Sequence, residues 1–229
     1  MIQLTVADIA ITSSRLVLDD FDYYIGRKLM LVLLVAYLSS EMIGNHLKAK
    51  PRLLTPGEMA MVTSVFKAAI TLTDVRVRQG PILPFQGEYA VTPMGGIYWP
   101  EKLYSKDYSL VRIEDRHFFM HEMVHIWQYQ MGMWVALRGA CSLLVDYHYA
   151  LTDDKVLSDY GMEQQASIIA DYYLLRDFGY DYWFGLTKQK YKGGEPKNKQ
   201  LVQDLWLKMY ENTLRLFLKN PQDKKALFG

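Results

Sequence analysis

The sequence FFMHEMVHIWQYQMG, residues 118–132, contains two histidines four positions apart, with a glutamate directly after the first. Apolar residues recur with helical spacing over about 109–131 and a glycine follows, which predicts one long helix. On a helix His121 and His125 lie on one face, one turn apart, where two imidazoles can bind a single cation. Glu122 lies beside the first histidine, where its carboxylate can take a proton from an attacking water. The spacing therefore predicts a Zn²⁺ site with Glu122 as the catalytic base.

A catalytic zinc site of this kind needs a third protein ligand from outside the motif. The metzincin pattern would supply a histidine six positions after His125, but that position is methionine, which excludes the pattern. The remaining candidates are side chains that can donate to zinc: His148, Asp159 and Glu163. We favour Glu163, because it begins a predicted helix over about 161–176 whose small residues would allow close packing against the first helix.

Other polar side chains near the motif have expected supporting roles. His117 lies one turn before His121 but about 12 Å from His125 along the helix axis, too far to share a metal ion. We therefore interpret it as structural or cleft-lining. Asp171, in the second predicted helix, is a candidate hydrogen-bond partner for a ligand histidine. Hydrolysis also needs a donor for the oxyanion that forms, and the candidates are His148, Tyr147, Tyr149 and Tyr160.

The residues before the motif predict two further helices. Residues 15–48 have a helical and hydrophobic pattern, and Pro51 ends any helix there. Thr55 is followed by a proline and, three positions on, by Glu58, which together form a capping box at the start of the next helix.

Two short stretches have the pattern of β-strands. DVRVRQG, residues 74–80, alternates apolar and polar residues, and EYAVTPMGGIYWP, residues 88–100, reads as strand, glycine turn and strand. An amphipathic helix is expected over 199–218. Together these patterns predict an α+β fold, mostly helical, with a small β-sheet beside the active-site helix. We expect an N-terminal helical segment, residues 1–50, and a domain with the zinc motif, residues 51–229.

Composition narrows the classes of function. The 229 residues include 26 basic and 25 acidic side chains, a net charge of +1, which gives no reason to expect a nucleic-acid partner. The single cysteine, Cys141, excludes an intrachain disulfide and lies in an apolar run, so we interpret it as a core residue. The N-terminus lacks the basic and apolar regions of a signal peptide.

The most apolar stretch is LMLVLLVAYLSS, residues 29–40. Its uninterrupted apolar part is about ten residues long, about half of the roughly 20 that a transmembrane helix needs. We therefore expect a buried helix and no transmembrane anchor, with contact at a membrane surface as the alternative.

Four stretches between about residues 53 and 178 together resemble a family of bacterial zinc metallopeptidase domains: LTPGEMAMVTSVFKAAITLTDVRVRQG, AVTPMGGIYWP, DYSLVRIEDRHFFMHEMVHIWQYQMG and DYGMEQQASIIADYYLL. These domains occur beside or fused to VgrG and Rhs proteins of the type VI secretion system. The resemblance implies a zincin-like fold with His121, His125 and Glu163 as zinc ligands and Glu122 as the base. In zincins an edge strand above the metal pairs with extended substrate, and GGIYWP is either that strand or an ordinary one.

The same resemblance implies an antibacterial effector that hydrolyses peptide bonds in a protein or peptide substrate. Its expected partners are VgrG or Rhs spike components and a cognate immunity protein. It would be made in the cytoplasm, secreted without a signal peptide, and delivered to the periplasm of a target cell. Two alternatives stay open, namely a peptidase or amidase for peptidoglycan stem peptides and a non-catalytic zincin-shaped adaptor on a secretion spike. The intact Glu122 argues against the adaptor, because metal binding alone does not require that carboxylate.

Overall fold

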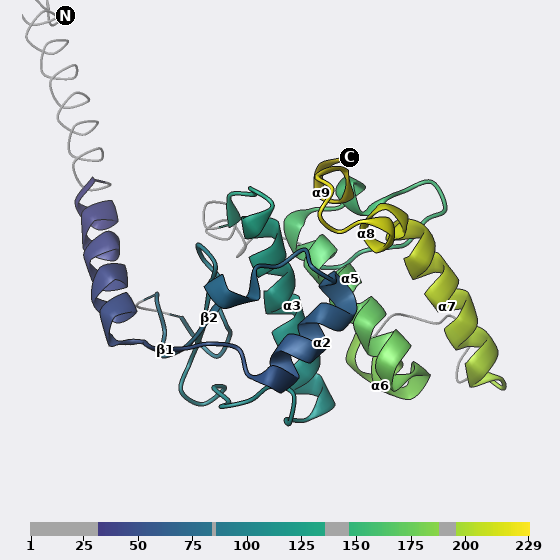
Figure 1. Cartoon of the computed structure of the whole chain (residues 1–229), viewed down its shortest axis with the longest axis horizontal. Helices are drawn as coiled ribbons and strands as arrows, with labels where there is room; N and C mark the ends of the chain where they lie inside the picture. Colours follow the sequence, from purple (N-terminus) through teal and green to yellow (C-terminus); the bar gives the residue numbers. More distant parts are fainter. Residues whose placement is uncertain (1–31, 84–85, 136–146, 188–195) are drawn as a thin grey trace, which may run out of the picture. The chain divides into compact units, whose positions relative to one another are not determined.

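A computed structural model describes residues 32–83, 86–135, 147–187 and 196–229 (Figure 1). The chain divides into two compact units, and the larger comprises Ala49–Pro81 and Gln86–Gly229. The prediction for Cys141 lies outside the described residues. Within the described ranges, every helix is too short or too polar to cross a membrane.

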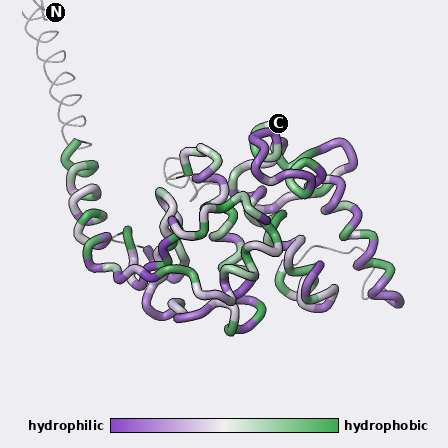
Figure 2. Tube along the Cα trace, in the orientation of Figure 1, coloured by the Kyte–Doolittle hydropathy of each residue, from purple (hydrophilic) through white to green (hydrophobic). Residues whose placement is uncertain are grey.

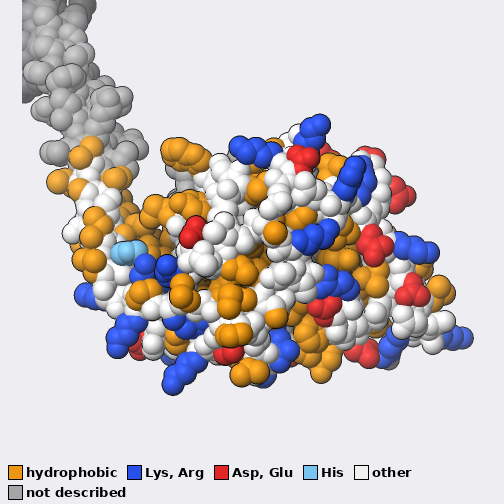
Figure 3. All heavy atoms as spheres, viewed as in Figure 1, with side chains coloured by type: hydrophobic (Ala, Val, Ile, Leu, Met, Phe, Trp, Pro, Cys, Tyr) orange, Lys and Arg blue, Asp and Glu red, His pale blue; other side chains and the backbone are white. Residues whose placement is uncertain are grey.

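The described part of the smaller unit is a helix over residues 32–48, together with Ile82 and Leu83. The side-chain amide of Asn45 donates a hydrogen bond to the carbonyl of Ile82 at 3.2 Å. The helical prediction is confirmed here, but the prediction of a buried helix is wrong. Figure 2 shows hydrophobic residues along this helix, and Figure 3 shows apolar side chains on its visible surface. Five apolar side chains are more than half exposed: Val32, Leu33, Leu34, Val35 and Tyr37. A short apolar run identifies a helix without specifying what covers it.

Among the described residues, the sheet of the larger unit has three strands, β1 (Lys50–Arg52), β2 (Arg76–Gln79) and β3 (Gly96–Trp99), in the order β1-β2-β3. β1 pairs antiparallel with β2, and β2 pairs parallel with β3, with Val77 opposite Ile97. The predicted strands at β2 and β3 are confirmed, but the strand predicted before the glycine turn is only an isolated bridge between Val91 and Tyr98. β1 was not predicted, since its central residue is a proline, a residue that sheets accept mainly in edge strands.

Helix α2 (Pro56–Phe66) begins with the predicted capping box. The Thr55 hydroxyl accepts a hydrogen bond from the backbone N–H of Glu58 at 3.1 Å, and the Glu58 carboxylate accepts one from the N–H of Thr55 at 2.9 Å. The fully buried Glu58 also accepts two hydrogen bonds from the guanidinium of Arg52, both at 2.7 Å. The cap thereby also ties the start of α2 to strand β1.

Helices α3 (Ile113–Gln130) and α5 (Met162–Phe178) pack against each other at the centre of the unit (Figure 1). Gly132, with a φ of +99°, follows α3 as predicted. Ala166 and Ala170 of α5 are fully buried, as expected of small residues between closely packed helices.

Four further helices follow α5 in the described part of the chain: α6 (Tyr180–Thr187), α7 (Lys199–Thr213), α8 (Arg215–Lys219) and α9 (Lys225–Phe228). Of these, α6 and α7 pack against α5, α8 packs against α7, and α9 packs against α8. The helix predicted over 199–218 is interrupted at Leu214, between α7 and α8. Short 3₁₀ turns lie at Leu72–Asp74 and Leu157–Asp159. The predicted α+β class, mostly helical with a small sheet, is confirmed.

Candidate metal centre

The two histidines of the motif and a glutamate from the second helix converge on one point. His121 Nε2 lies 3.2 Å, and His125 Nε2 3.1 Å, from the same oxygen of Glu163, Oε2. A ligand atom from each of the three lies within 4.8 Å of the others. The side chains of His125 and Glu163 are each 7% exposed and that of His121 is 14% exposed. Of the three candidates for a third ligand, the structure brings Glu163 to the histidine pair.

The separation of these atoms fits a single metal ion. Zinc binds imidazole nitrogen and carboxylate oxygen at about 2.0–2.2 Å, so two ligand atoms at tetrahedral positions lie roughly 3.3 Å apart. The observed 3.1 and 3.2 Å separations are close to that value. Two imidazoles and one carboxylate, with one position open for water, are also a ligand set found in catalytic zinc sites.

A chain of glutamines orients His125. Its Nδ1 lies 2.8 Å from Oε1 of Gln128, one turn further along α3. The amide of Gln128 donates in turn to the carbonyl of Met162 at 3.0 Å and to Oε1 of Gln165 at 2.9 Å. Because Oε1 can only accept, Nδ1 carries a proton, and Nε2 is the ring nitrogen turned toward Glu163 that could bind a metal ion. Sequence reasoning missed Gln128, although a glutamine three positions after a ligand histidine was a usable signal.

The contact between His125 and Glu163 favours a proton on His125 when no metal is bound. Burial lowers the pKa of His125, but the hydrogen bond to Glu163 and its charge outweigh burial and raise the pKa to about 9. Burial likewise raises the pKa of Glu163, while the contacts with His121 and His125 outweigh it and lower that pKa. A buried carboxylate between two imidazoles is a site for one cation, either a proton or a metal ion.

Glu122, the expected base, is 4% exposed and accepts a hydrogen bond at 2.5 Å from the hydroxyl of Thr92. Thr92 follows Val91, whose N–H and carbonyl pair with Tyr98 of β3 at 3.2 and 2.9 Å. The polypeptide just before β3 is thus tied both to the sheet and to the motif. Thr92 had no signal in the sequence, because the contact joins residues 30 positions apart.

The Val91 pairing also bears on the role of β3. The backbone of Tyr98 faces away from β2 and is bonded to Val91, and its carbonyl also accepts from the side-chain amide of Gln86 at 2.9 Å. The outer edge of β3 is therefore occupied at this position by the chain itself. Of the two interpretations of GGIYWP, an ordinary sheet strand fits the structure.

Asp171 contacts His117 rather than a histidine of the motif. His117 Nε2 lies 2.7 Å from one oxygen of Asp171, and the hydroxyl of Tyr149 donates to the other at 2.5 Å. The Tyr149 hydroxyl also lies 2.6 Å from that of Tyr210 on α7, which accepts from the indole N–H of Trp183 at 3.0 Å. This buried network links α3, α5, α6 and α7.

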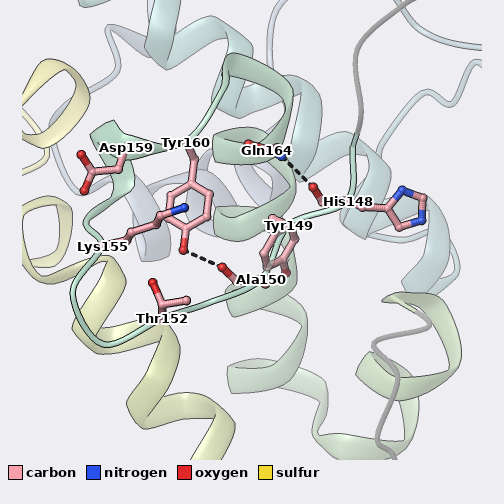
Figure 4. A pocket seen from close by; sticks show the side chains of 8 residues that line it. All are labelled: His148, Tyr149, Ala150, Thr152, Lys155, Asp159, Tyr160 and Gln164. Carbon is pink, nitrogen blue, oxygen red and sulfur yellow. Dashed lines mark hydrogen bonds between the residues drawn. The ribbon is translucent and has the colours of Figure 1, made fainter.

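Other expected site residues lie along a nearby cavity of about 400 Å³ (Figure 4). Asp159 is exposed there, and its carboxylate accepts from the N–H of Val156 at 2.8 Å. The Tyr160 hydroxyl donates to the carbonyl of Ala150 at 2.8 Å. His148 is exposed, and Figure 4 shows its imidazole turned away from the other lining side chains.

Tyr147 lies next to the candidate metal ligands. Its ring centroid is 6.3 Å from that of His121, and its side chain is 47% exposed. Burial and the charges of Glu163 and Glu122 raise the pKa of its hydroxyl to about 12. Its hydroxyl is therefore protonated at neutral pH and lies within electrostatic range of both carboxylates.

The fold and site define an α+β domain with a buried His-His-Glu group able to hold a metal ion. No family model matches the chain. The chain is similar to the type VI secretion system spike protein VgrG2b of Pseudomonas aeruginosa strain PAO1, with 40% identity over 137 aligned residues that cover 56% of the chain. The alignment spans only 13% of VgrG2b.

A solved structure identifies the part of VgrG2b that corresponds to this chain. The effector domain of Pseudomonas aeruginosa VgrG2b superposes with a TM-score of 0.53 at 36% identity, over 59% of this chain and 81% of that one. The chain is a homologue of this effector domain. The predicted relation to VgrG-associated domains of the type VI secretion system is thereby confirmed.

Proposed function

We propose that this chain is a zinc metallopeptidase domain that acts as an antibacterial effector of a type VI secretion system. The observation that carries the proposal is the buried group of His121, His125 and Glu163. Its support is twofold: Glu122 lies beside the group on the same helix, and the chain is homologous to the VgrG2b effector domain. The His-His-Glu group alone would also fit a structural metal site, and the homology alone would also fit an inactive relative.

Bound by these three side chains, zinc would polarise the scissile carbonyl and make water a stronger nucleophile. Glu122 accepts a proton from the water as its oxygen adds to the carbonyl carbon. The same carboxylic acid then gives this proton to the amide nitrogen, and the C–N bond breaks. One water is consumed for each peptide bond cleaved. The short hydrogen bond from Thr92 holds the Glu122 carboxylate in one orientation throughout.

A peptide substrate fits the polypeptide beside Glu122. Val91 pairs with Tyr98 of β3, and the next residue, Thr92, bonds to Glu122, so this segment lies beside the proposed base. An extended peptide could bind beside it through main-chain hydrogen bonds. The substrate class proposed here is therefore a protein or peptide in extended conformation.

The proposed route of delivery follows from the relative. VgrG2b is a spike protein of the type VI secretion system, so this domain would travel with spike components and act in the periplasm of a neighbouring cell. A cognate immunity protein would protect the producing cell. With a single cysteine, the domain has no intrachain disulfide to form after delivery.

The test compares expression of the domain in a susceptible bacterium with and without an added secretory signal. We expect growth arrest only with the signal, and loss of that arrest in Glu122→Gln with zinc content unchanged. Glu114→Gln, an exposed position on the same helix, is the matched control and should arrest growth fully. Arrest by Glu122→Gln would favour the adaptor, and cleavage of muropeptides but not of proteins would favour the stem-peptide enzyme. Growth arrest without the signal would indicate that the substrate lies in the cytosol.

A further inference from the structure

Four residues were candidates to stabilise the oxyanion of the reaction, and their surroundings separate them. The hydroxyl of Tyr149 is bonded to Asp171 and Tyr210, and that of Tyr160 donates to Ala150. The His148 imidazole is turned away from the residues that line the cavity beside it (Figure 4). Tyr147 combines a half-exposed side chain with a ring whose centroid lies 6.3 Å from that of His121.

The segment that carries Tyr147 is anchored by side chains from the body of the domain. Gln164, directly after Glu163 on α5, donates its amide hydrogen to the carbonyl of His148 at 2.6 Å (Figure 4). Tyr160 bonds the carbonyl of Ala150 at 2.8 Å. Between these two, the Tyr149 side chain reaches inward to Asp171. Three consecutive residues after Tyr147 are therefore fixed, which is what a positioned donor requires.

We propose that Tyr147 is a catalytic residue whose hydroxyl donates a hydrogen bond to the oxyanion formed when water adds to the scissile carbonyl. The proposal rests on the proposed metallopeptidase function. The carbonyl oxygen takes up the electron pair of its π bond as the new C–O bond forms, and it returns the pair when the C–N bond breaks. Tyr147 keeps its own proton throughout, so the proton balance stays with Glu122 and water.

Tyr149, Gln164 and Tyr160 are positioning residues in this arrangement. They act on the reaction through the backbone that carries Tyr147, not through contact with substrate. A donor held in place before the reaction needs no reorganisation as charge develops, which is the main advantage of a preorganised oxyanion site. Loosening the anchor should therefore lower kcat more than it raises KM.

The test uses the cobalt-loaded protein and acetohydroxamate, a small anionic ligand whose oxygens bind the metal ion where an oxyanion would form. Binding is followed by the change in the visible cobalt spectrum, so no substrate is needed. We expect Tyr147→Phe to take up cobalt as the wild type does and to bind acetohydroxamate about 10- to 100-fold more weakly, because a charge-assisted hydrogen bond is lost. Tyr182→Phe, which removes a hydroxyl from an equally exposed tyrosine on α6, should bind like the wild type.

The outcomes separate this proposal from the one on which it rests. Cobalt uptake with equal acetohydroxamate affinity in Tyr147→Phe and wild type would overturn the role of Tyr147 and leave the metal site standing. Failure of the wild type to take up cobalt or zinc would overturn both. Tyr149→Phe is a second test, because it leaves Tyr147 unchanged and removes only the hydroxyl that anchors residue 149 to Asp171. This variant should weaken acetohydroxamate binding less than Tyr147→Phe does.

Discussion

The contact between Glu163 and the two histidines predicts how the stability of the metal-free protein depends on pH. The pKa of His125 is raised from 6.5 to about 9, chiefly because the Glu163 contact outweighs burial. A rise of this size corresponds to about 3 kcal/mol of folding free energy. Since the folded-state pKa is the higher one, this stability is fully present below pH 6.5 and is lost as the pH rises through 9.

Glu163→Gln tests this reasoning, because it removes the charge and keeps the shape. Urea unfolding with a chelator present, at pH 6 and pH 9.5, gives the free energy of unfolding for both proteins. We expect the wild type to lose about 2–3 kcal/mol more than Glu163→Gln between the two pH values. Taking the difference between the proteins cancels groups that titrate alike in both. Equal losses in the two proteins would show that Glu163 does not hold a proton on His125.

Three further predictions concern the metal and the helix interface. Glu163→Ala should lose the one zinc ion per molecule and His148→Ala should keep it, as measured by metal analysis; the opposite result would change the third ligand. Gln128→Leu should weaken zinc binding about 10- to 100-fold in competition with a chelator, because His125 loses its orienting partner. Ala166→Leu should destabilise the fold by about 1–3 kcal/mol in urea unfolding, since the Ala166 side chain on α5 is fully buried; unchanged stability would mean that the helices around this position can move apart.

Helical periodicity was enough to predict the main elements of the site. The histidine pair and the helix that carries it depend on residues close in sequence, and so does the capping box at Thr55. Glu163 was selected from three candidates because small residues on α5 indicated close packing. Each of these inferences needs only local spacing and side-chain size.

The contacts that could not be predicted join distant parts of the chain. Thr92 reaches Glu122 only because the segment before β3 folds back onto the sheet. Asp171 was expected to support a ligand histidine, but its place on α5 puts it opposite His117. The apolar helix over 32–48 shows the same limit, since hydrophobicity did not determine its burial. Such contacts depend on register between elements, which the sequence does not encode locally.

The pairing of α3 with α5 also explains why one histidine–carboxylate contact is suited to a metal and the other is not. Along α3 the positions 117 and 125 meet residues 171 and 163 of α5, so the helices run antiparallel and the two carboxylates lie two turns apart. At Asp171, one histidine and one tyrosine hydroxyl each use a separate oxygen. At Glu163, two imidazole nitrogens approach the same oxygen, which leaves a point that a single cation can share. At Asp171 the second partner is a tyrosine hydroxyl, which donates its own proton, whereas at Glu163 it is a second imidazole nitrogen, which can bind a metal ion. The same antiparallel packing therefore forms a structural contact between His117 and Asp171 and, two turns away, a candidate metal centre at Glu163.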